Sequence, residues 1–221
     1  MAFILNLETA TRNCSVALAK DGEVVALREI AGEGYLHAEK LHLFIEEVID
    51  AAGIRLNELS AVAVSMGPGS YTGLRIGVSA AKGLCYALSL PLIAIDTLEV
   101  LARRLTVQEG LIIPMIDARR MEAYTAVFDG VYGNLRKTKA EIIIDTSFSE
   151  YDGTIHLVGD GAVKCSGVLQ EERFVFHNDI LFPSAVQMCA LSYAKHKKSD
   201  TVDVAYFEPF YLKDFIVGKP L

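Results

Sequence analysis

The sequence predicts an α/β protein built from two lobes. The first observation is the order of elements in the first hundred residues, where three strands are followed by alternating helices and strands. The second is the segment 61–88, in which a short apolar strand, a glycine-rich turn and a long proline-free helix follow one another. The third is size, because a chain of 221 residues that is 52% hydrophobic can bury a substantial core in one or two compact units.

The predicted first lobe begins with three antiparallel strands, and the pair Asp21-Gly22 marks the hairpin between the second and third of them. A helix, a strand, a second helix and a last strand follow. The resulting order, β-β-β-α-β-α-β, is the pattern of an RNase H-like lobe. The strands are expected at residues 3–7, 14–19, 23–30, 61–66 and 91–95, and the helices at residues 37–52 and 72–88.

The first of these helices is amphipathic. One stripe along it is apolar, so this stripe should pack against the sheet, and Gly53 is placed to end the helix. The stripe consists of Leu41, Phe44, Ile45, Val48, Ile49 and Ala52.

The second half of the chain has a less regular pattern. Turn signals at Asp129-Gly130 and Tyr132-Gly133 separate two of its strands, and Ser184 is a suitable cap for a late helix. The boundary between the lobes should fall near residues 96–108, which divides the chain into lobes 1–104 and 105–221. Strands are expected at residues 111–115, 122–128, 139–144, 155–158 and 173–176, and a helix at residues 184–196.

The glycine-rich turn between strand 61–66 and helix 72–88 is the most informative segment. It reads Gly67-Pro68-Gly69-Ser70-Tyr71-Thr72-Gly73. A strand, a glycine turn and a helix N-terminus together can cradle an anion, because free N–H groups and the helix dipole converge there. The alternative is a tight turn without a ligand. The segment is not a Walker A loop, because no Gly-Lys-Ser/Thr follows the glycines.

Composition limits the classes of partner. The formal net charge is −7, so the chain by itself is a poor candidate for binding nucleic acid, which requires lysine and arginine against phosphates. There is no leader-like start and no run of eighteen apolar residues, so a cytoplasmic protein without membrane contact is expected. The four cysteines, Cys14, Cys85, Cys165 and Cys189, are widely spaced and are expected to be reduced.

The turn and the helix after it, Gly67 to Gly77, closely resemble the signature of the TsaB (YeaZ) family, whose members act in making threonylcarbamoyladenosine in tRNA. The resemblance extends over nearly the whole chain in the expected order. Further matching segments are Ile4 to Thr11, Pro114 to Tyr124, Gly159 to Ala162 and Pro209 to Lys213.

This resemblance implies an actin/hexokinase-like (ASKHA) fold made of two RNase H-like lobes. It also implies a non-catalytic subunit that supports TsaD, the subunit that transfers threonylcarbamoyl to N6 of adenosine 37 of tRNA. The ATPase TsaE would be a third partner. ATP and metal are expected on the partner subunits, and tRNA is expected to contact this chain only through the complex.

No catalytic or metal-binding residue is expected in this chain. The related TsaD binds its metal with two histidines four residues apart on a helix, whereas His37 and His42 are five apart. They would therefore diverge by roughly 140° around a helix. Glu8 stands where most family members have aspartate, and we interpret it as a residue that caps or orients the first turn.

Two features near the second lobe give no clearer sign of an active site. The sequence has no GxSxG nucleophile elbow. The charged residues Asp117, Arg119, Arg120 and Glu122 could form a polar rim beside a cleft or a charged turn that ties the lobes together, and we favour the turn.

The helix 72–88 is apolar nearly all round, which predicts burial on two sides. One face should lie on the sheet. The other carries small residues that would let a partner helix approach closely, unless helix 37–52 covers it, and the resemblance implies pairing with TsaD or with a second copy through these two helices. The predicted partner-interface residues are Leu43, Ile76, Ala80, Gly83 and Ala87.

Two other classes of function stay open at this point. One is an enzyme, either a nucleotide-dependent member of the ASKHA superfamily or a degenerate glycoprotease-like protein. The other is a self-sufficient homodimer with a regulatory or binding role.

Overall fold

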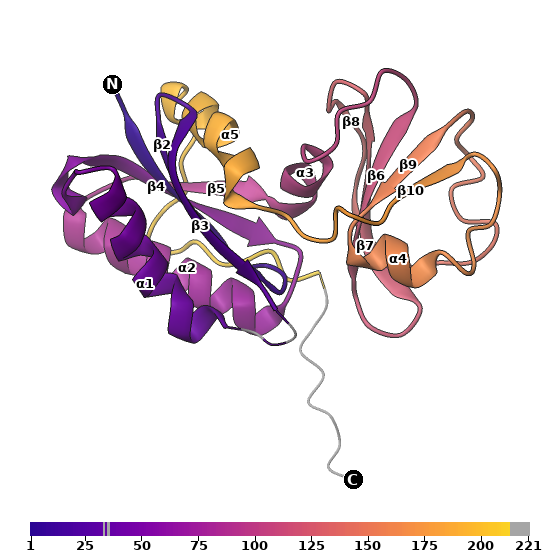
Figure 1. Ribbon diagram of the computed structural model, residues 1–221, viewed down its shortest axis with the longest axis horizontal. Coiled ribbons are helices and arrows are strands. Elements are labelled where there is room, and N and C mark those ends of the chain that lie inside the picture. Colours follow the sequence, from indigo (N-terminus) through magenta and orange to yellow (C-terminus); the bar gives the residue numbers. More distant parts are fainter. Residues whose placement is uncertain (33, 35, 213–221) are drawn as a thin grey trace, which may run out of the picture.

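The computed structural model describes residues 1–32, 34 and 36–212 and shows two lobes side by side (Figure 1). Each lobe contains a five-stranded sheet, with the strand order β3-β2-β1-β4-β5 in the first and β10-β9-β6-β7-β8 in the second. The first sheet is formed by β1 (Phe3–Glu8), β2 (Asn13–Lys20), β3 (Glu23–Ala31), β4 (Leu59–Gly67) and β5 (Leu92–Asp96). The second is formed by β6 (Leu111–Asp117), β7 (Glu122–Asp129), β8 (Asn134–Ile142), β9 (Ile155–Val158) and β10 (Phe174–His177).

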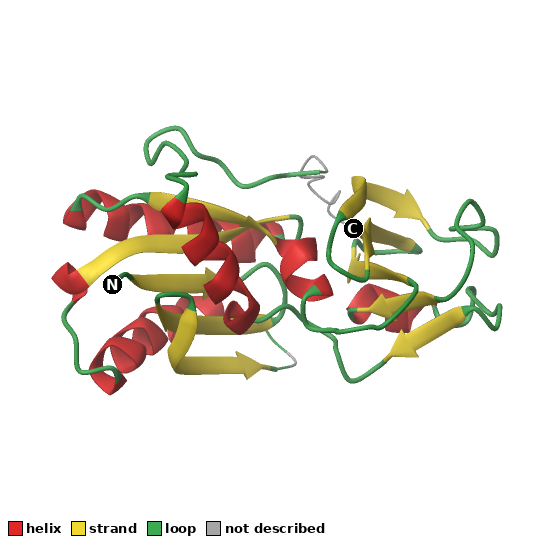
Figure 2. Ribbon diagram, turned by 90° about the horizontal axis from the view of Figure 1, so that it is seen from above, coloured by secondary structure: helices red, strands yellow, loops and turns green. Residues whose placement is uncertain are grey.

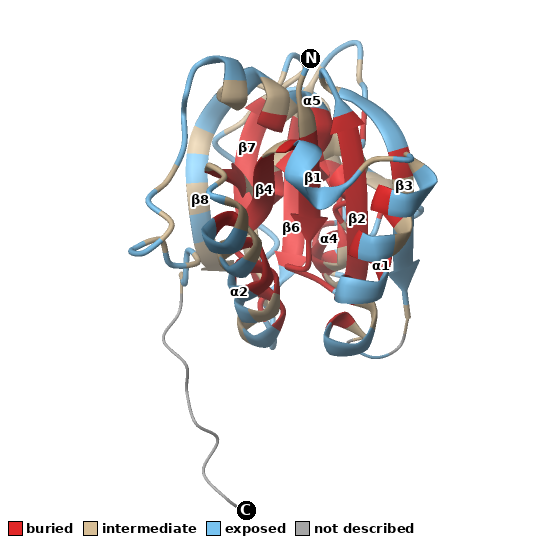
Figure 3. Cartoon of the chain, turned by 90° about the vertical axis from the view of Figure 1, so that its left-hand side faces the viewer, coloured by how far each residue is buried: buried red, intermediate tan, exposed pale blue. Residues whose placement is uncertain are grey.

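Helices cover both faces of the first sheet (Figures 1 and 2). Side chains alternate between the two faces of a strand, so Leu5 and Leu7 of β1 pack under α1 (His37–Ala51) and α2 (Tyr71–Leu88). Ile4 points to the opposite face, which is covered by α5 (Ala185–Lys197). Strands β1, β2, β4 and β5 are therefore mostly buried, whereas the edge strand β3 and the outer sides of α1 and α2 are largely exposed (Figure 3).

The second sheet is covered by two short helices that the sequence analysis did not predict. One face packs against α4 (Asp160–Cys165) and the other against α3 (Thr97–Ala102), which also joins the lobes. Each spans six residues, too short for a helical periodicity to be recognised. The carboxylate of Asp96 starts α3 by accepting a hydrogen bond from the N–H of Glu99 at 2.9 Å.

Strand β8 begins at Asn134 rather than at the predicted residue 139. The turn before it is very tight, because the carboxylate of Asp129 accepts hydrogen bonds from the N–H groups of Val131 and Gly133 at 2.9 and 2.7 Å. Tyr132 lies in the left-handed region with φ +65°. The chain can therefore resume its extended conformation directly after the turn.

The last helix crosses back to the first lobe. Although residues 105–221 were predicted to form the second lobe, α5 packs on the first sheet through Ala185, Met188 and Cys189. The hydroxyl of Ser184 donates to Glu29 of β3 at 2.7 Å, and Arg104 donates to the carbonyl of Phe182 at 2.7 Å. The two sheets thus divide the chain near the predicted boundary, but the helix 185–197 belongs by packing to the first lobe.

After α5 the chain runs along the first lobe as a strap, which we define as residues 199–212. Its Val202 forms an isolated antiparallel bridge with Leu92 of β5. The ammonium group of Lys82 on α2 donates to the carbonyls of Ala205 and Phe207 at 3.1 and 2.9 Å. In the described part of the chain, no helix is long and apolar enough to span a membrane.

Candidate functional site

The glycine-rich turn, residues 67–73, packs tightly against the backbone between β1 and β2. A Cβ atom added at Gly69 would lie 2.3 Å from the carbonyl oxygen of Ala10, and one at Gly73 would lie 2.2 Å from that of Thr9. The N–H of Ser70 donates to the Ala10 carbonyl at 2.7 Å. The carbonyl oxygens of Thr9 and Ala10, which carry partial negative charge, fill the space beside these glycines. The geometry therefore favours a structural turn that positions α2, rather than an anion cradle.

The start of α2 is fixed from both ends of the turn. The N–H of Gly67 donates to the hydroxyl of Thr97 in α3 at 3.0 Å, and Gly67 has φ +112°. The hydroxyl of Ser70 accepts from the N–H of Gly73 at 3.3 Å and so caps the helix. The turn therefore links the first lobe to the helix that joins the lobes.

The strap covers the turn from outside. The N–H of Phe210 donates to the carbonyl of Met66 at 2.7 Å, and the rings of Tyr211 and Tyr71 lie 5.0 Å apart. The guanidinium group of Arg75 stacks over Tyr71 at 4.5 Å. Lys213, the last residue of the matching segment Pro209 to Lys213, lies outside the described residues.

Glu8 is completely buried at the end of β1. Its Oε1 atom accepts hydrogen bonds from the N–H of Ala10 at 2.6 Å and from the hydroxyl of Ser65 at 3.0 Å. Its Oε2 atom has no partner among the described residues. Burial raises the pKa of this carboxyl to about 7, against the two hydrogen bonds that lower it. These contacts fit the interpretation of Glu8 as the residue that orients the first turn.

The histidine pair separates as its spacing predicts. His37 is buried, and its Nε2 atom lies 2.8 Å from the carbonyl oxygen of Thr11, while burial lowers its pKa. His42 is exposed and lines a groove between α1 and α2. Among residues 1–32, 34 and 36–212, no three or more His, Cys, Asp or Glu side chains are grouped as metal ligands.

The charged segment 117–122 forms the hairpin tip between β6 and β7. The carboxylate of Asp117 accepts from the N–H of Arg119 at 2.7 Å and pairs with Lys164 of α4. Arg119 and Arg120 have φ values of +68° and +48°, a left-handed conformation that costs a side-chain-bearing residue about 1 kcal/mol. Asp160 accepts from the N–H of Asp117 at 3.0 Å, so the segment is braced against α4.

The carboxyl group of Asp160, which braces this segment, is perturbed by burial and by nearby charge. Burial raises the pKa of Asp160, and the nearby guanidinium group of Arg12, which follows β1 in the first lobe, opposes this shift. The bonds within the segment and to α4 are consistent with its interpretation as a charged turn.

A groove of about 560 Å³ lies between α1 and α2 on the outside of the first lobe. Three of the predicted interface residues, Ile76, Ala80 and Gly83, line it. Gly83 is exposed, and a Cβ atom added there would meet nothing within 4 Å. The complete lining is His42, Arg75, Ile76, Ser79, Ala80, Gly83 and Leu84.

The other two predicted interface residues lie on the exposed sides of the same helices. Leu43 is 42% exposed on α1, and Ala87 is exposed on α2. Ala80 differs from the prediction of a free outer face, because it is only 9% exposed and belongs to the core that includes α1. The helix α1 therefore covers part of the outer face of α2 and leaves the rest open.

Comparison of the sequence with known proteins identifies the family. A family model described as "TsaD: tRNA N6-adenosine threonylcarbamoyltransferase" matches residues 33–214. The tRNA threonylcarbamoyladenosine biosynthesis protein TsaB of Escherichia coli K12 is 30% identical over 228 residues, which cover 99% of this chain and 97% of that protein. The chain belongs to the TsaB family.

Solved structures agree with this assignment. YeaZ from Pseudomonas aeruginosa superimposes with a TM-score of 0.83 at 26% identity, covering 96% of this chain and 100% of YeaZ. The ethanolamine utilization protein EutJ from Carboxydothermus hydrogenoformans gives a TM-score of 0.51 at 14% identity over 86% of this chain and 89% of EutJ, which shows a shared fold alone. The actin/hexokinase-like fold predicted from the TsaB resemblance is therefore confirmed.

One prominent residue on the helix surface is not among the predicted interface residues. Tyr86 of α2 is 86% exposed, and it lies one residue before Ala87 on the side that α1 leaves open. Tyrosine is favoured at protein interfaces because it combines a large apolar ring with a polar tip. An aromatic residue within an otherwise small-residue face of a TsaB helix was the available signal.

Proposed function

We propose that this member of the TsaB family serves tRNA threonylcarbamoyladenosine biosynthesis as a non-catalytic subunit that pairs through α1 and α2 with the transferase subunit TsaD. The TsaE-like ATPase would join this pair. Without TsaD, the chain would form a homodimer through the same helices. The proposed location is the cytoplasm, where the tRNA substrate is.

The observation that carries the proposal is the partly open surface of α1 and α2. Gly83 and Ala87 have small side chains, so a partner helix can approach the backbone of α2 closely. Leu43 and Tyr86 add exposed apolar area beside them. A solvent-facing helix surface with this composition is typical of a protein interface.

The absence of catalysis by this chain is part of the proposal. The turn 67–73 uses the N–H groups of Gly67 and Ser70 for internal bonds to Thr97 and Ala10. Asp117 at the end of β6 is paired with Lys164. The formal net charge of −7 supports tRNA contact through the complex rather than by this chain alone.

The decisive experiment is threonylcarbamoyl transfer to tRNA by purified TsaD and TsaE, supplied with threonylcarbamoyl-adenylate, with and without this chain. We expect turnover to require the chain, and the chain alone to be inert. Nucleotide hydrolysis or substrate modification by the chain alone would instead support the ASKHA-enzyme or glycoprotease-like alternative.

The helix surface is tested by Gly83→Arg. Because a side chain at this position meets open space, we expect an unchanged thermal midpoint but a Kd for TsaD that is at least roughly tenfold weaker, a loss of about 1.4 kcal/mol. Ser149→Arg adds the same charge at an exposed position in the second lobe and should leave the Kd unchanged. Equal affinities of the two variants would exclude this surface as the TsaD contact.

A further inference from the structure

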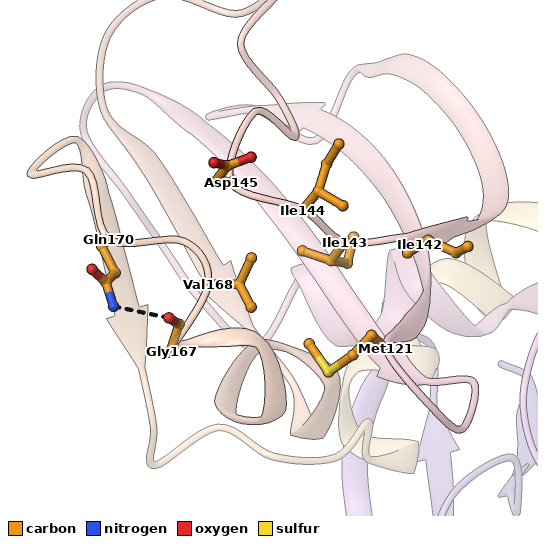
Figure 4. Close-up of a pocket in the computed structure, with 8 residues that line it drawn as sticks. All are labelled: Met121, Ile142, Ile143, Ile144, Asp145, Gly167, Val168 and Gln170. Carbon is orange, nitrogen blue, oxygen red and sulfur yellow. Dashed lines mark hydrogen bonds between the residues drawn. The ribbon is translucent and has the colours of Figure 1, made fainter.

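The second lobe carries two features that the proposed pairing through α1 and α2 does not use. One is a mostly apolar groove of about 610 Å³, which we call the second groove (Figure 4). Of its polar side chains, the amide of Gln170 is used internally, because it donates to the carbonyl of Gly167 at 2.9 Å. The other feature is a pair of histidines, which is better suited to select a ligand. The second groove is lined by Met121, Ile142, Ile143, Ile144, Asp145, Gly167, Val168 and Gln170.

The two histidines are His156 of β9 and His177 at the end of β10. The Nδ1 atom of His156 lies 3.0 Å from the Nε2 atom of His177, and the ring centroids are 5.2 Å apart. Both residues are partly exposed, so solvent can reach them. They are 21 positions apart in the chain, and the pairing of β9 with β10 brings them together.

Strand pairing holds both rings on the same face of the second sheet. In the parallel register His156 lies opposite Val175, and His177 lies opposite Val158. Since paired residues point to the same face, and residues two apart in a strand do so too, the histidines are diagonal neighbours. The N–H of Ile180 donates to the carbonyl of His177 at 3.0 Å, which also fixes the backbone after β10. The two nitrogens are therefore positioned by the sheet before any ligand binds.

The charge around the pair favours a cation. Burial and the neighbouring ring of His156 lower the pKa of His177, so the ring is neutral at neutral pH and can act as a metal ligand. Asp179 is exposed two residues further along, and its carboxylate is close enough to oppose this lowering of the pKa. Two neutral nitrogens thus lie beside a negative charge.

The separation of the nitrogens fits two neighbouring ligands of one metal ion. With metal–nitrogen distances of about 2.1 Å, a separation of 3.0 Å corresponds to an angle of about 90° at the metal. A right angle is typical of octahedral and tetragonal ions such as Ni²⁺ and Cu²⁺, whereas tetrahedral Zn²⁺ takes about 109°. Without a metal, one ring donates its N–H to the other. On metal binding this proton would pass through solvent to the other nitrogen of its own ring, so both rings stay neutral.

We propose that His156 and His177 chelate a divalent transition-metal ion of the nickel or copper class, with water at its remaining positions. In the part of the chain that the structure describes, no third His, Cys, Asp or Glu side chain joins the pair to form a metal-binding group. The ion would connect the edge strand β10 to β9, just before the chain returns to the first lobe through α5. Because both ligands meet only when these strands are paired, the ion should stabilise the folded state.

The test is isothermal titration calorimetry of the full chain with NiCl₂ at neutral pH, without a histidine tag, since a tag would itself bind the ion. We expect one Ni²⁺ per chain, and a Kd that is at least roughly tenfold weaker in His156→Gln and in His177→Gln. Glutamine keeps a polar side chain but removes the imidazole nitrogen. His196→Gln, in the last turn of α5, is the matched control and should bind Ni²⁺ as the unaltered chain does.

Electron paramagnetic resonance of the Cu²⁺-loaded chain reports the ligands directly. We expect two nitrogen ligands in the unaltered chain and one in each single variant. Equal Ni²⁺ affinities of His177→Gln and the unaltered chain would overturn the proposal, as would the same number of nitrogen ligands in both. Tighter binding of Zn²⁺ than of Ni²⁺ would contradict the right-angled geometry. Thermal midpoints without metal show whether the variants are folded.

The histidine pair does not depend on the proposed function. Gly83→Arg changes α2 in the first lobe, so this variant should bind Ni²⁺ as the unaltered chain does. Conversely, His177→Gln should leave the Kd for TsaD unchanged. Failure of the metal site is therefore distinguishable from failure of the pairing through α1 and α2.

Discussion

The two lobes use the same local construction at the carboxyl ends of their parallel strands. In the first lobe β1 pairs with β4, and in the second β6 pairs with β9; each pair is followed by a glycine turn and a helix. A Cβ atom at Gly73 would lie 2.2 Å from the Thr9 carbonyl oxygen, and one at Gly159 would lie 2.2 Å from that of Met115. In both lobes, glycine lets the turn approach the neighbouring strand end.

The lobes differ in the helix that follows. Helix α2 continues for 18 residues and offers its outer side to a partner, whereas α4 ends after six. The loop beyond α4 then lines the second groove with Gly167 and Val168. The same turn thus supports two kinds of surface, a helix surface in one lobe and an apolar groove in the other.

The largest expected effect comes from placing a methyl group in these turns. We expect Gly73→Ala to lower the free energy of unfolding by about 3 kcal/mol or more, because the new Cβ would meet backbone atoms that cannot move independently. Gly161→Ala, whose Cβ would lie 2.9 Å from the Met115 backbone, should cost less. Urea denaturation of both variants measures the difference. Gly83→Ala, on the same helix but in open space, should be neutral or stabilising. Equal losses at positions 73 and 161 would show that the distance from the added Cβ to the backbone does not set the cost.

The second effect concerns the acidic residue that ends the first strand of each lobe. Glu8 is buried and Asp117 is exposed and ion-paired. Because the folded-state pKa of Glu8, about 7, lies above its ordinary value of 4.5, its contribution to stability is full below pH 4.5 and is lost as the pH rises to 7. The loss amounts to about 3 kcal/mol.

Glu8→Gln should remove this loss, so the difference in free energy of unfolding between the variant and the unaltered chain should change by about 3 kcal/mol between pH 4.5 and 8. Denaturation curves at several pH values measure it. Ser65→Ala is the matched variant, since it deletes a hydrogen bond that lowers the Glu8 pKa. This variant should raise that pKa further, so the loss of stability should extend to a higher pH. Parallel pH profiles for Glu8→Gln and the unaltered chain would show that Glu8 does not titrate in this range.

The smallest expected effect comes from removing the hydroxyl of Ser184, where the chain returns from the second lobe to the first. The hydroxyl of Ser184 caps α5 by accepting from the N–H of Val186 at 3.3 Å and donates to Glu29 at 2.7 Å. We expect Ser184→Ala to cost about 1–2 kcal/mol in urea denaturation. Ser70→Ala removes the cap of α2 without a carboxylate partner and should cost less. A larger loss at Ser70 would mean that the bond to Glu29 adds little.

The elements of the first lobe could be predicted because each has a strong local signal. The Asp21-Gly22 hairpin, the stripe of α1 and the glycine turn before α2 all lie where the sequence places them. The short helices α3 and α4 gave no such signal, because six residues complete fewer than two helical turns. The burial of Ala80 could not be read from α2 alone, since it depends on the position of α1.

Local patterns along the chain were enough to predict the family, the two-lobed α/β fold and the helices proposed to form the partner surface, because these depend on local periodicity and on a glycine turn with few backbone alternatives. Three features emerged from the three-dimensional packing alone: α5 packs on the first sheet, Glu8 is buried with a raised pKa, and Met121, Ile142 and Val168 line one groove. Each of these brings together segments distant in the chain, and such contacts are fixed by packing of the whole molecule rather than by the order of nearby residues.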